Sequence, residues 1–340
     1  MPRMSTTDVE VQLRTADELS RGGRTLDAIE ALTEAYDASP NIRLACRLVE
    51  LRHAAFPELP RTPGRPTWPA TFADPFPGQS GIVEASPRQL SGELLGGAIT
   101  HHGCLRVNGL IDDGTVARLR DRIEAAFEAR ARVVEGAPLE SAAPAFIPYA
   151  PDQEKAKGFG GDLFVRVVDA PEALCDLVDV FTEAGVRRAV TEYLGERPAA
   201  IANKWILRRS PSGVVLGDFH QDGAFLGEGI RTVDCWIALS HCGPGTDRPA
   251  IDLVPTRLDR VLPTGEGSTF NWSLAEETVL EAVPDVPVAS PIFAPGDAIF
   301  FDERLLHRTT VGSDLQTRYA IESWFVAPSS YPAKHLPIVL

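Results

Sequence analysis

The chain has 340 residues, of which 44% are hydrophobic and 24% charged, and its formal net charge is −14 at pH 7. An acidic surface repels the phosphate backbone, which excludes nucleic acid as an expected partner. No apolar run approaches the roughly 18 residues of a membrane helix, and the first residues lack the apolar stretch of a secretion signal. We therefore expect a globular, cytoplasmic protein without a membrane partner.

Residues 1–56 are predicted to form a small helical appendage. Apolar residues recur there at helical spacing, Gly22-Gly23 interrupts the pattern, and Pro40 ends it. The spacing resembles one tetratricopeptide repeat, with a third helix after it. One repeat cannot bury its own apolar face. We therefore expect it to dock on the main domain or on a second copy of the chain, which would give a homodimer.

A proline-rich linker is predicted over residues 57–87. Seven prolines lie between positions 57 and 77, a density that prevents both helix and sheet. We expect Trp68, Phe72 and Phe76 to hold this linker against a surface of the main domain.

The main domain is predicted over residues 88–340. Helical patterns come first, and short β-rich runs separated by turn residues follow from Ala199 onward. This order predicts an α+β fold whose strands form a double-stranded β-helix, the cupin-like jelly roll, with flanking helices. The expected helices lie over 88–99, from Asp112 or Asp113 onward, and over 171–195. The expected strands lie over 201–209, 232–239, 250–254, 298–301 and 318–326.

Three residues form a candidate metal site. His220 and Asp222 stand two apart in the segment FHQDG, so both face one side if the segment lies at a strand. His307 follows the turn and apolar strand FAPGDAIFF, where it can complete a site from a neighbouring strand. Two histidines and one carboxylate leave coordination positions open, which is the facial triad of iron(II) oxygenases.

Arg318 opens a predicted strand eleven residues after His307. An arginine near a ferrous site can grip a carboxylate by a two-pronged hydrogen bond. Thr309 could donate a further hydrogen bond to the same carboxylate.

Four segments together resemble the phytanoyl-CoA dioxygenase family of 2-oxoglutarate oxygenases, over roughly residues 90–328. ITHHGCLRVNGLIDDGTVARLRDRIEAAF is similar to that family's first strand and helix, and FHQDG to its first metal motif. FAPGDAIFFDERLLHRTT is similar to its distal-histidine strand, and TRYAIESWFV to its cosubstrate-arginine strand. The four segments occur in the family's order and at its spacing.

The resemblance implies a function and a set of roles. It implies that His220, Asp222 and His307 ligate iron(II), that Arg318 and Thr309 bind the distal carboxylate of 2-oxoglutarate, and that O2 is the other cosubstrate. The implied reaction is hydroxylation or oxidative cyclisation of a small molecule, in bacterial secondary metabolism such as antibiotic biosynthesis.

The resemblance also points to Trp236 and Arg166 as further cosubstrate-binding candidates. The stretch ALSHCGPGTDRPAIDLVPTRLDRV departs from the family's pattern, because no histidine follows Pro255. No metal ligand is lost by this difference. Either residues 131–162 or residues 255–290 could cover the substrate.

Other functions remain open at this point. A non-catalytic metal-binding scaffold of the same fold would have no need of the three ligands together with Arg318. A zinc hydrolase with the same triad would leave Arg318 and Thr309 unexplained. An iron halogenase is disfavoured, since Asp222 fills the position that a halide would occupy.

Overall fold

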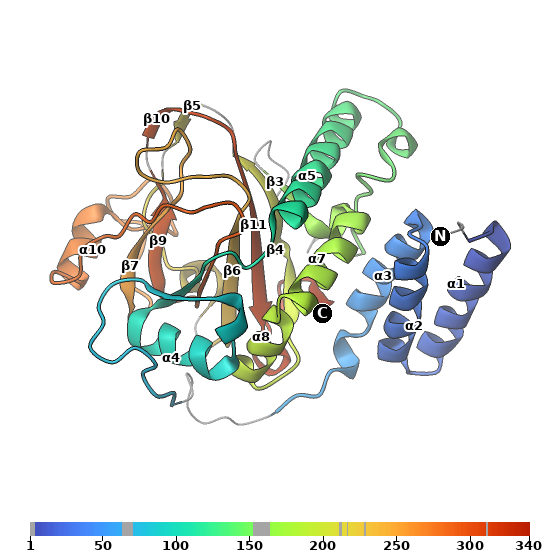
Figure 1. Ribbon diagram of the computed structural model, residues 1–340, viewed down its shortest axis with the longest axis horizontal. Coiled ribbons are helices and arrows are strands. Elements are labelled where there is room, and N and C mark those ends of the chain that lie inside the picture. The colour runs from blue at the N-terminus through green and yellow to red at the C-terminus, as the bar shows by residue number, and fades with distance from the viewer. Residues whose placement is uncertain are drawn as a thin grey trace.

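The computed structural model describes residues 4–62, 71–151, 164–210, 213–215, 217–227, 229–310 and 312–340. Figure 1 shows α1 (Thr6–Arg21), α2 (Thr25–Ala38) and α3 (Ile42–Ala54) at one end of the molecule, beside a body in which further helices cover a large sheet. In the described chain no helix combines the length and apolar character needed to cross a membrane.

The expected helices are present, with one break, and two short helices, Gly223–Leu226 and Glu276–Ala282, were not predicted. Asp112 caps its helix by accepting a hydrogen bond from the Thr115 backbone at 2.7 Å, as predicted. The helical stretch predicted over 171–195 is two helices, because Gly185 takes a left-handed conformation with φ 74° between them. The helices are α1 (Thr6–Arg21), α2 (Thr25–Ala38), α3 (Ile42–Ala54), α4 (Gly92–His102), α5 (Asp113–Val134), α7 (Pro171–Glu183), α8 (Val186–Leu194), α9 (Gly223–Leu226) and α10 (Glu276–Ala282).

An eight-stranded sheet forms the centre of the body, in the order β1-β2-β8-β6-β11-β4-β12, with β3 also paired to β4. All of its pairs are antiparallel except β1 with β2. Two further antiparallel pairs are β7 with β9 and β5 with β10. The strands are β1 (Val83–Ala85), β2 (Cys104–Val107), β3 (Phe164–Arg166), β4 (Ala199–Ser210), β5 (Gly213–Val215), β6 (Thr232–Ala238), β7 (Ile251–Arg257), β8 (Ala298–Phe301), β9 (Leu305–Thr309), β10 (Gly312–Leu315), β11 (Arg318–Val326) and β12 (Pro337–Val339).

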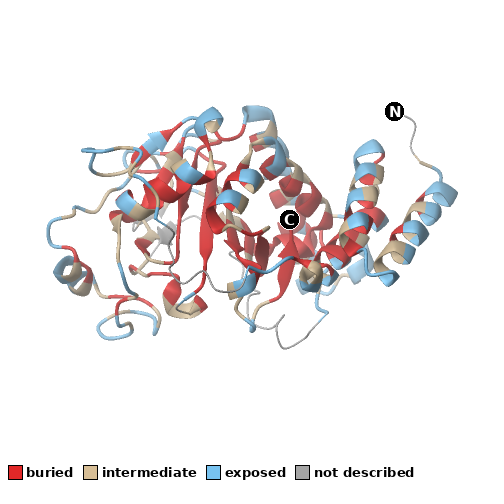
Figure 2. Ribbon diagram, turned by 90° about the horizontal axis from the view of Figure 1, so that it is seen from below, coloured by how far each residue is buried: buried red, intermediate tan, exposed pale blue. Residues whose placement is uncertain are grey.

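The two faces of the large sheet have different neighbours. Residues of a strand alternate between faces, so Cys235 and Ile237 of β6 join the core under the helices, while Trp236 joins a second core with Leu253 of β7 and Leu305 of β9. Figure 2 shows the sheet as the most deeply buried part of the body. The second core therefore lies between the large sheet and the β7–β9 pair.

Helices α1 to α3 pack on one another and on the body. α3 contacts α7 and β12, and Arg52 of α3 donates a hydrogen bond to the Val339 carbonyl at 3.0 Å. Cys175 and Ala199 of the body belong to the same apolar cluster as these helices. The three helices and the body therefore share one apolar core. The tetratricopeptide character of residues 1–56 and their status as a separate domain stay predictions.

The structure describes the linker over residues 57–62 and from residue 71 onward. Phe72 and Phe76 pack against the main core, where the Phe72 ring lies 5.8 Å from that of Tyr193. Trp68, Pro63, Pro66 and Pro69 lie outside the described residues, as do positions 152–162 of the loop predicted over 131–162.

The fold is confirmed as helices combined with a large, mainly antiparallel sheet.

Candidate metal centre and its pocket

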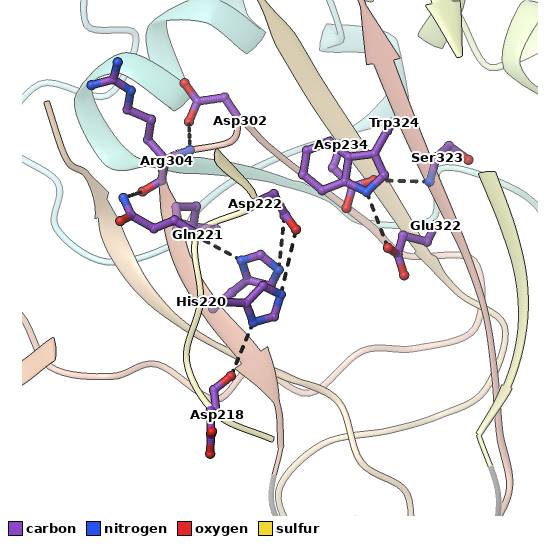
Figure 3. Close-up of polar contacts among 12 residues, drawn as sticks. Asp218, His220, Gln221, Asp222, Asp234, Asp302, Arg304, Glu322, Ser323 and Trp324 are labelled. Atoms are coloured by element: carbon purple, nitrogen blue, oxygen red, sulfur yellow. Dashed lines mark hydrogen bonds and ion pairs between the residues drawn. The ribbon is translucent and has the colours of Figure 1, made fainter. Parts of the chain in front are cut away.

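His220, Asp222 and His307 come together in three dimensions, and one ligand atom from each lies within 4.8 Å of the others. Nε2 of His220 is 3.8 Å from Oδ1 of Asp222, and Nε2 of His307 is 3.5 Å from Oδ2 of the same carboxylate. Figure 3 shows the His220 imidazole beside the Asp222 carboxylate. A single ion between them could be reached by all three side chains.

Backbone pairing brings the two histidines together. The N–H of each donates to the carbonyl of the other, at 2.9 and 3.1 Å, in an isolated antiparallel bridge. Residues paired in this way project their side chains to the same side of the ladder. His307 lies within β9, whereas the sequence placed it just beyond the end of the preceding strand.

Gln221 and Gly223 fix the turn that presents Asp222. The Gln221 side chain is fully buried and points away from the site, where its amide donates to the carbonyls of Arg260 and Arg304. Gly223 donates to the Glu303 carbonyl at 2.9 Å, and a Cβ atom there would come within 2.5 Å of Val261. A larger residue at position 223 would therefore displace the turn that holds the carboxylate.

Each imidazole uses Nδ1 for a hydrogen bond, which leaves Nε2 available to bind a metal. Nδ1 of His220 lies 3.3 Å from the Asp218 carbonyl, and Nδ1 of His307 lies 3.1 Å from the Leu305 carbonyl. A carbonyl accepts only, so Nδ1 carries the proton in both rings and Nε2 keeps its lone pair. Oδ2 of Asp222 is buried without a hydrogen-bond partner in the described structure. This donor set and the orphaned oxygen fit a divalent cation.

The electrostatics of the metal-free site agree with that fit. Burial lowers the pKa of His307 to about 4, and burial together with His307 lowers the pKa of His220. Both rings are therefore neutral at neutral pH, the form that binds metals. Burial also raises the pKa of Asp222 well above its usual range. A cation at this point would replace the proton that the buried carboxylate otherwise tends to keep.

A pocket of about 470 Å³ opens over the three residues. Arg318, Thr309 and Trp236 line it together with the two histidines and Asp222. The remaining lining residues are Lys204, Arg208, Phe225, Asp234, Ile251, Trp272, Phe301, Arg308, Glu322, Lys334 and His335.

Arg318 is held rigidly at one end of this pocket. Its Nη1 donates to the carbonyls of Pro249 and Ala250 at 3.1 and 3.3 Å, and its Nη2 to the Ser210 hydroxyl at 3.1 Å. Its Nε is buried and has no partner in the described structure, and its guanidinium lies 5.4 Å from the centroid of the Trp236 ring. Burial lowers the pKa of Arg318 to about 10, which still leaves it charged at neutral pH. A fixed cation with a vacant donor suits a carboxylate ligand.

Arg166 is not brought to the pocket. Its Nε and Nη2 donate to the two carboxylate oxygens of Asp169, at 2.7 and 2.6 Å, and Nη2 also donates to the Tyr149 carbonyl. This bidentate pair holds β3 to the segment after it, and the structure gives Arg166 a packing role in place of the expected contact with the cosubstrate.

Several charged pocket residues escaped the sequence reasoning. Asp234 and Glu322 stand at inward-facing positions of the apolar strands β6 and β11, and Arg208 of β4 pairs with Glu322 at 2.6 Å. The available signal was a lone charge within an alternating apolar strand, because such a charge is buried only where a partner or a ligand meets it.

One of the two segments considered as a substrate cover contributes to the pocket. Trp272 of the segment 255–290 lines it, whereas the described part of 131–162 supplies no lining residue.

Comparisons with known proteins find distant structural matches. No protein-family model matches this chain, and a search of curated proteins finds no match. The non-heme alpha ketoglutarate dependent carbocyclase SnoK from nogalamycin biosynthesis is 17% identical, with a TM-score of 0.47 over 72% of this chain and 86% of that one. EctD from S. alaskensis with bound Fe is 14% identical, with a TM-score of 0.48 over 68% and 75% of the two chains. AviO1 from Streptomyces viridochromogenes Tue57 is 16% identical, with a TM-score of 0.45 over 72% and 99%. At this distance the function is inferred from the residues of the site.

Proposed function

We propose that this chain is an iron(II)- and 2-oxoglutarate-dependent oxygenase related to the phytanoyl-CoA dioxygenase family, acting on a small-molecule substrate. The observation that carries the proposal is the metal-ready triad of His220, Asp222 and His307 in one pocket with the vacant donor of Arg318. We further propose that the large sheet and the β7–β9 pair, which face each other across this pocket, are the two sheets of a double-stranded β-helix.

Iron(II) in this site would couple the oxidative decarboxylation of 2-oxoglutarate by O2, which gives succinate and CO2, to insertion of the second oxygen atom into a substrate C–H bond. The side chains of His220, Asp222 and His307 would hold the metal, and three protein ligands would leave coordination positions open. Nδ1–H donation by both histidines to backbone carbonyls fixes their ring planes, so that Nε2 stays aimed at the metal.

Arg318 orients the cosubstrate. Its vacant Nε–H and the remaining Nη2–H form a fork that can donate to both oxygens of the distal carboxylate, and Thr309 also lines the pocket. Ile251 and Trp236 give this end an apolar surround, which strengthens the ion pair by excluding water. A zinc hydrolase would have no use for this carboxylate anchor.

The test is anaerobic addition of iron(II) and 2-oxoglutarate to the metal-free protein, with absorption spectroscopy. We expect the weak visible charge-transfer band of the chelate, and no band when zinc replaces iron. Admission of O2 should then produce succinate. Absence of both the band and succinate from freshly iron-loaded protein would contradict the proposal. Zinc-dependent hydrolysis that does not need 2-oxoglutarate would instead identify the protein as a zinc hydrolase.

A further inference from the structure

The pocket wall beside the metal-binding histidines is aromatic. Trp272 lines the pocket, and its ring meets the ring of His220 at 81° with the centroids 5.1 Å apart. Phe270 stacks on Trp272 with planes 6° apart and centroids 4.9 Å apart, and is 46% exposed. The rings of His220, Trp272 and Phe270 thus form a continuous series from the metal site to the surface.

Hydrogen bonds from the metal-binding segment hold this wall in place. The Asp218 carboxylate accepts from the Thr269 backbone and from the Ser273 hydroxyl, the latter at 3.0 Å. The Leu274 N–H donates to the Phe219 carbonyl at 2.7 Å. Ser273 is fully buried. Asp218 and Phe219, the two residues before His220, therefore hold the segment that carries Trp272 in its position at the pocket.

The opposite wall is charged. Asp234 of β6 and the Arg208–Glu322 pair stand on the large sheet, and Figure 3 shows Asp234 and Glu322 together to one side of His220. Asp234 is 2% exposed, and one of its oxygens accepts from the Ser323 backbone at 3.1 Å. An apolar group placed against these polar and charged groups would offer them no hydrogen bond, which carries a desolvation cost. Apolar parts of a substrate belong on the other side.

Trp272 is the aromatic surface best placed to receive them. Phe225 also lines the pocket, but the ammonium group of Lys204 lies 3.9 Å from its ring centroid and so covers one face of that ring. Phe270 lies behind Trp272 and steadies the plane of the indole.

We infer that Trp272 determines substrate specificity, and that the substrate presents an apolar ring face to its indole while hydroxyl or amino groups on the ring point toward Asp234 and Glu322. Aromatic rings and the flat faces of saturated sugar rings share this chemistry. The inference rests on the proposed function, because it names the substrate class of the same site. It is separable in experiment, since the wall is present without metal or cosubstrate.

The test is isothermal titration calorimetry on the metal-free full chain with two probes, 2-naphthol for the aromatic ring and methyl β-glucopyranoside for the sugar ring. We expect one of the two to bind with a stoichiometry of one. Trp272→Ala should weaken it about tenfold, equivalent to about 1.4 kcal/mol, and Trp272→Phe should restore most of the affinity. Leu280→Ala removes another exposed apolar side chain, outside the pocket on α10, and should change nothing.

The charge-transfer band with iron(II) and 2-oxoglutarate should persist in Trp272→Ala, which shows that the variant is folded and keeps its metal site. Binding of neither probe to the wild type, or equal affinity of wild type and Trp272→Ala, would overturn the inference while leaving the oxygenase proposal standing. A missing band in the wild type would instead overturn the oxygenase proposal, whatever the probes do.

Discussion

Oδ2 of Asp222 lies 3.5 Å from Nε2 of His307 and has no hydrogen-bond partner in the described structure. A buried carboxylate oxygen without a partner costs free energy, and the cost disappears when a cation binds between the two residues. The same atom thus destabilises the metal-free chain and stabilises the metal-bound one.

Asp222→Ala should therefore have opposite effects on the two forms. We expect iron(II) affinity to fall by more than about 100-fold, because losing even an outer-shell partner of a ligand costs about 10- to 100-fold. The metal-free variant should keep or exceed the unfolding free energy of the wild type. Equilibrium dialysis with metal analysis, together with urea denaturation, measures both quantities. Asp285→Ala, at an exposed loop position, is the matched control, and a variant that bound iron like the wild type would remove Asp222 from the ligand set.

Arg318→Lys should weaken 2-oxoglutarate binding by about tenfold or more and leave iron binding intact. Lysine keeps the charge but loses the planar fork. It also cannot keep all three of the protein contacts that now orient the guanidinium. Titration of 2-oxoglutarate against the charge-transfer band at fixed iron(II) gives the affinity. Arg166→Lys, whose parent side chain is bound to Asp169 outside the pocket, serves as the comparison. If Arg166→Lys rather than Arg318→Lys weakened 2-oxoglutarate binding, Arg166 and not Arg318 would be the cosubstrate anchor.

His335 should make the metal-free protein sensitive to acid. Both of its ring nitrogens are buried without partners, and burial, followed by Lys334, lowers its pKa to about 4. The unfolded chain, with a pKa near 6.5, binds more protons than the folded chain between these two values. Unfolding free energy is therefore lost as the pH falls through this window.

His335→Gln should lose less stability than the wild type over the same window, because glutamine does not titrate. Urea denaturation of the metal-free proteins at neutral pH and within the window gives the difference. Identical pH dependence of the two proteins would show that His335 is already accessible to protons in the folded state.

Residues 1–56 should not contribute to catalysis. A chain shortened to begin near Asp74 is expected to bind iron(II) and 2-oxoglutarate with unchanged affinity, because the pocket lining contains no residue of α1 to α3 in the described structure. Its melting temperature should fall, because the removal exposes the apolar cluster that α3 shares with α7 and β12 and breaks the bond from Arg52 to Val339. A folded shortened chain that fails to bind iron would place part of the site in these helices.

The sequence predicted that His220, Asp222 and His307 come together, because their spacing reflects local geometry. His220 and Asp222 stand in one short segment, and His307 follows a turn-and-strand pattern that the structure contains as β8 and β9. The cap at Asp112 was equally local. The helix break at Gly185 was missed, because a lone glycine within an apolar helical pattern does not reveal its left-handed conformation.

The pocket walls could not be predicted in the same way. Asp234 and Glu322 meet only because β6 and β11 pair in one particular register, and periodicity along one strand carries no information about its neighbour. Trp272 reaches the metal site through the contacts of Asp218 with Thr269 and Ser273. Arg166 was misjudged for the reverse reason, since its nearest carboxylate, Asp169, was only three residues away.

The five consecutive residues 218–222 include two of the three candidate metal ligands, His220 and Asp222, and also three residues that hold neighbouring segments in place. Asp218 and Phe219 accept hydrogen bonds from the segment that carries Trp272. The Gln221 side chain hydrogen-bonds to the backbone of Arg260 and Leu262. Remodelling the pocket for a new substrate by exchanging residues 260–274 would therefore disturb the metal ligands as well. Changes in substrate specificity would therefore tend to alter metal affinity too, in evolution as in design. Metal affinity would be least affected by substitution of single side chains such as Trp272 that leaves the backbone around them unchanged.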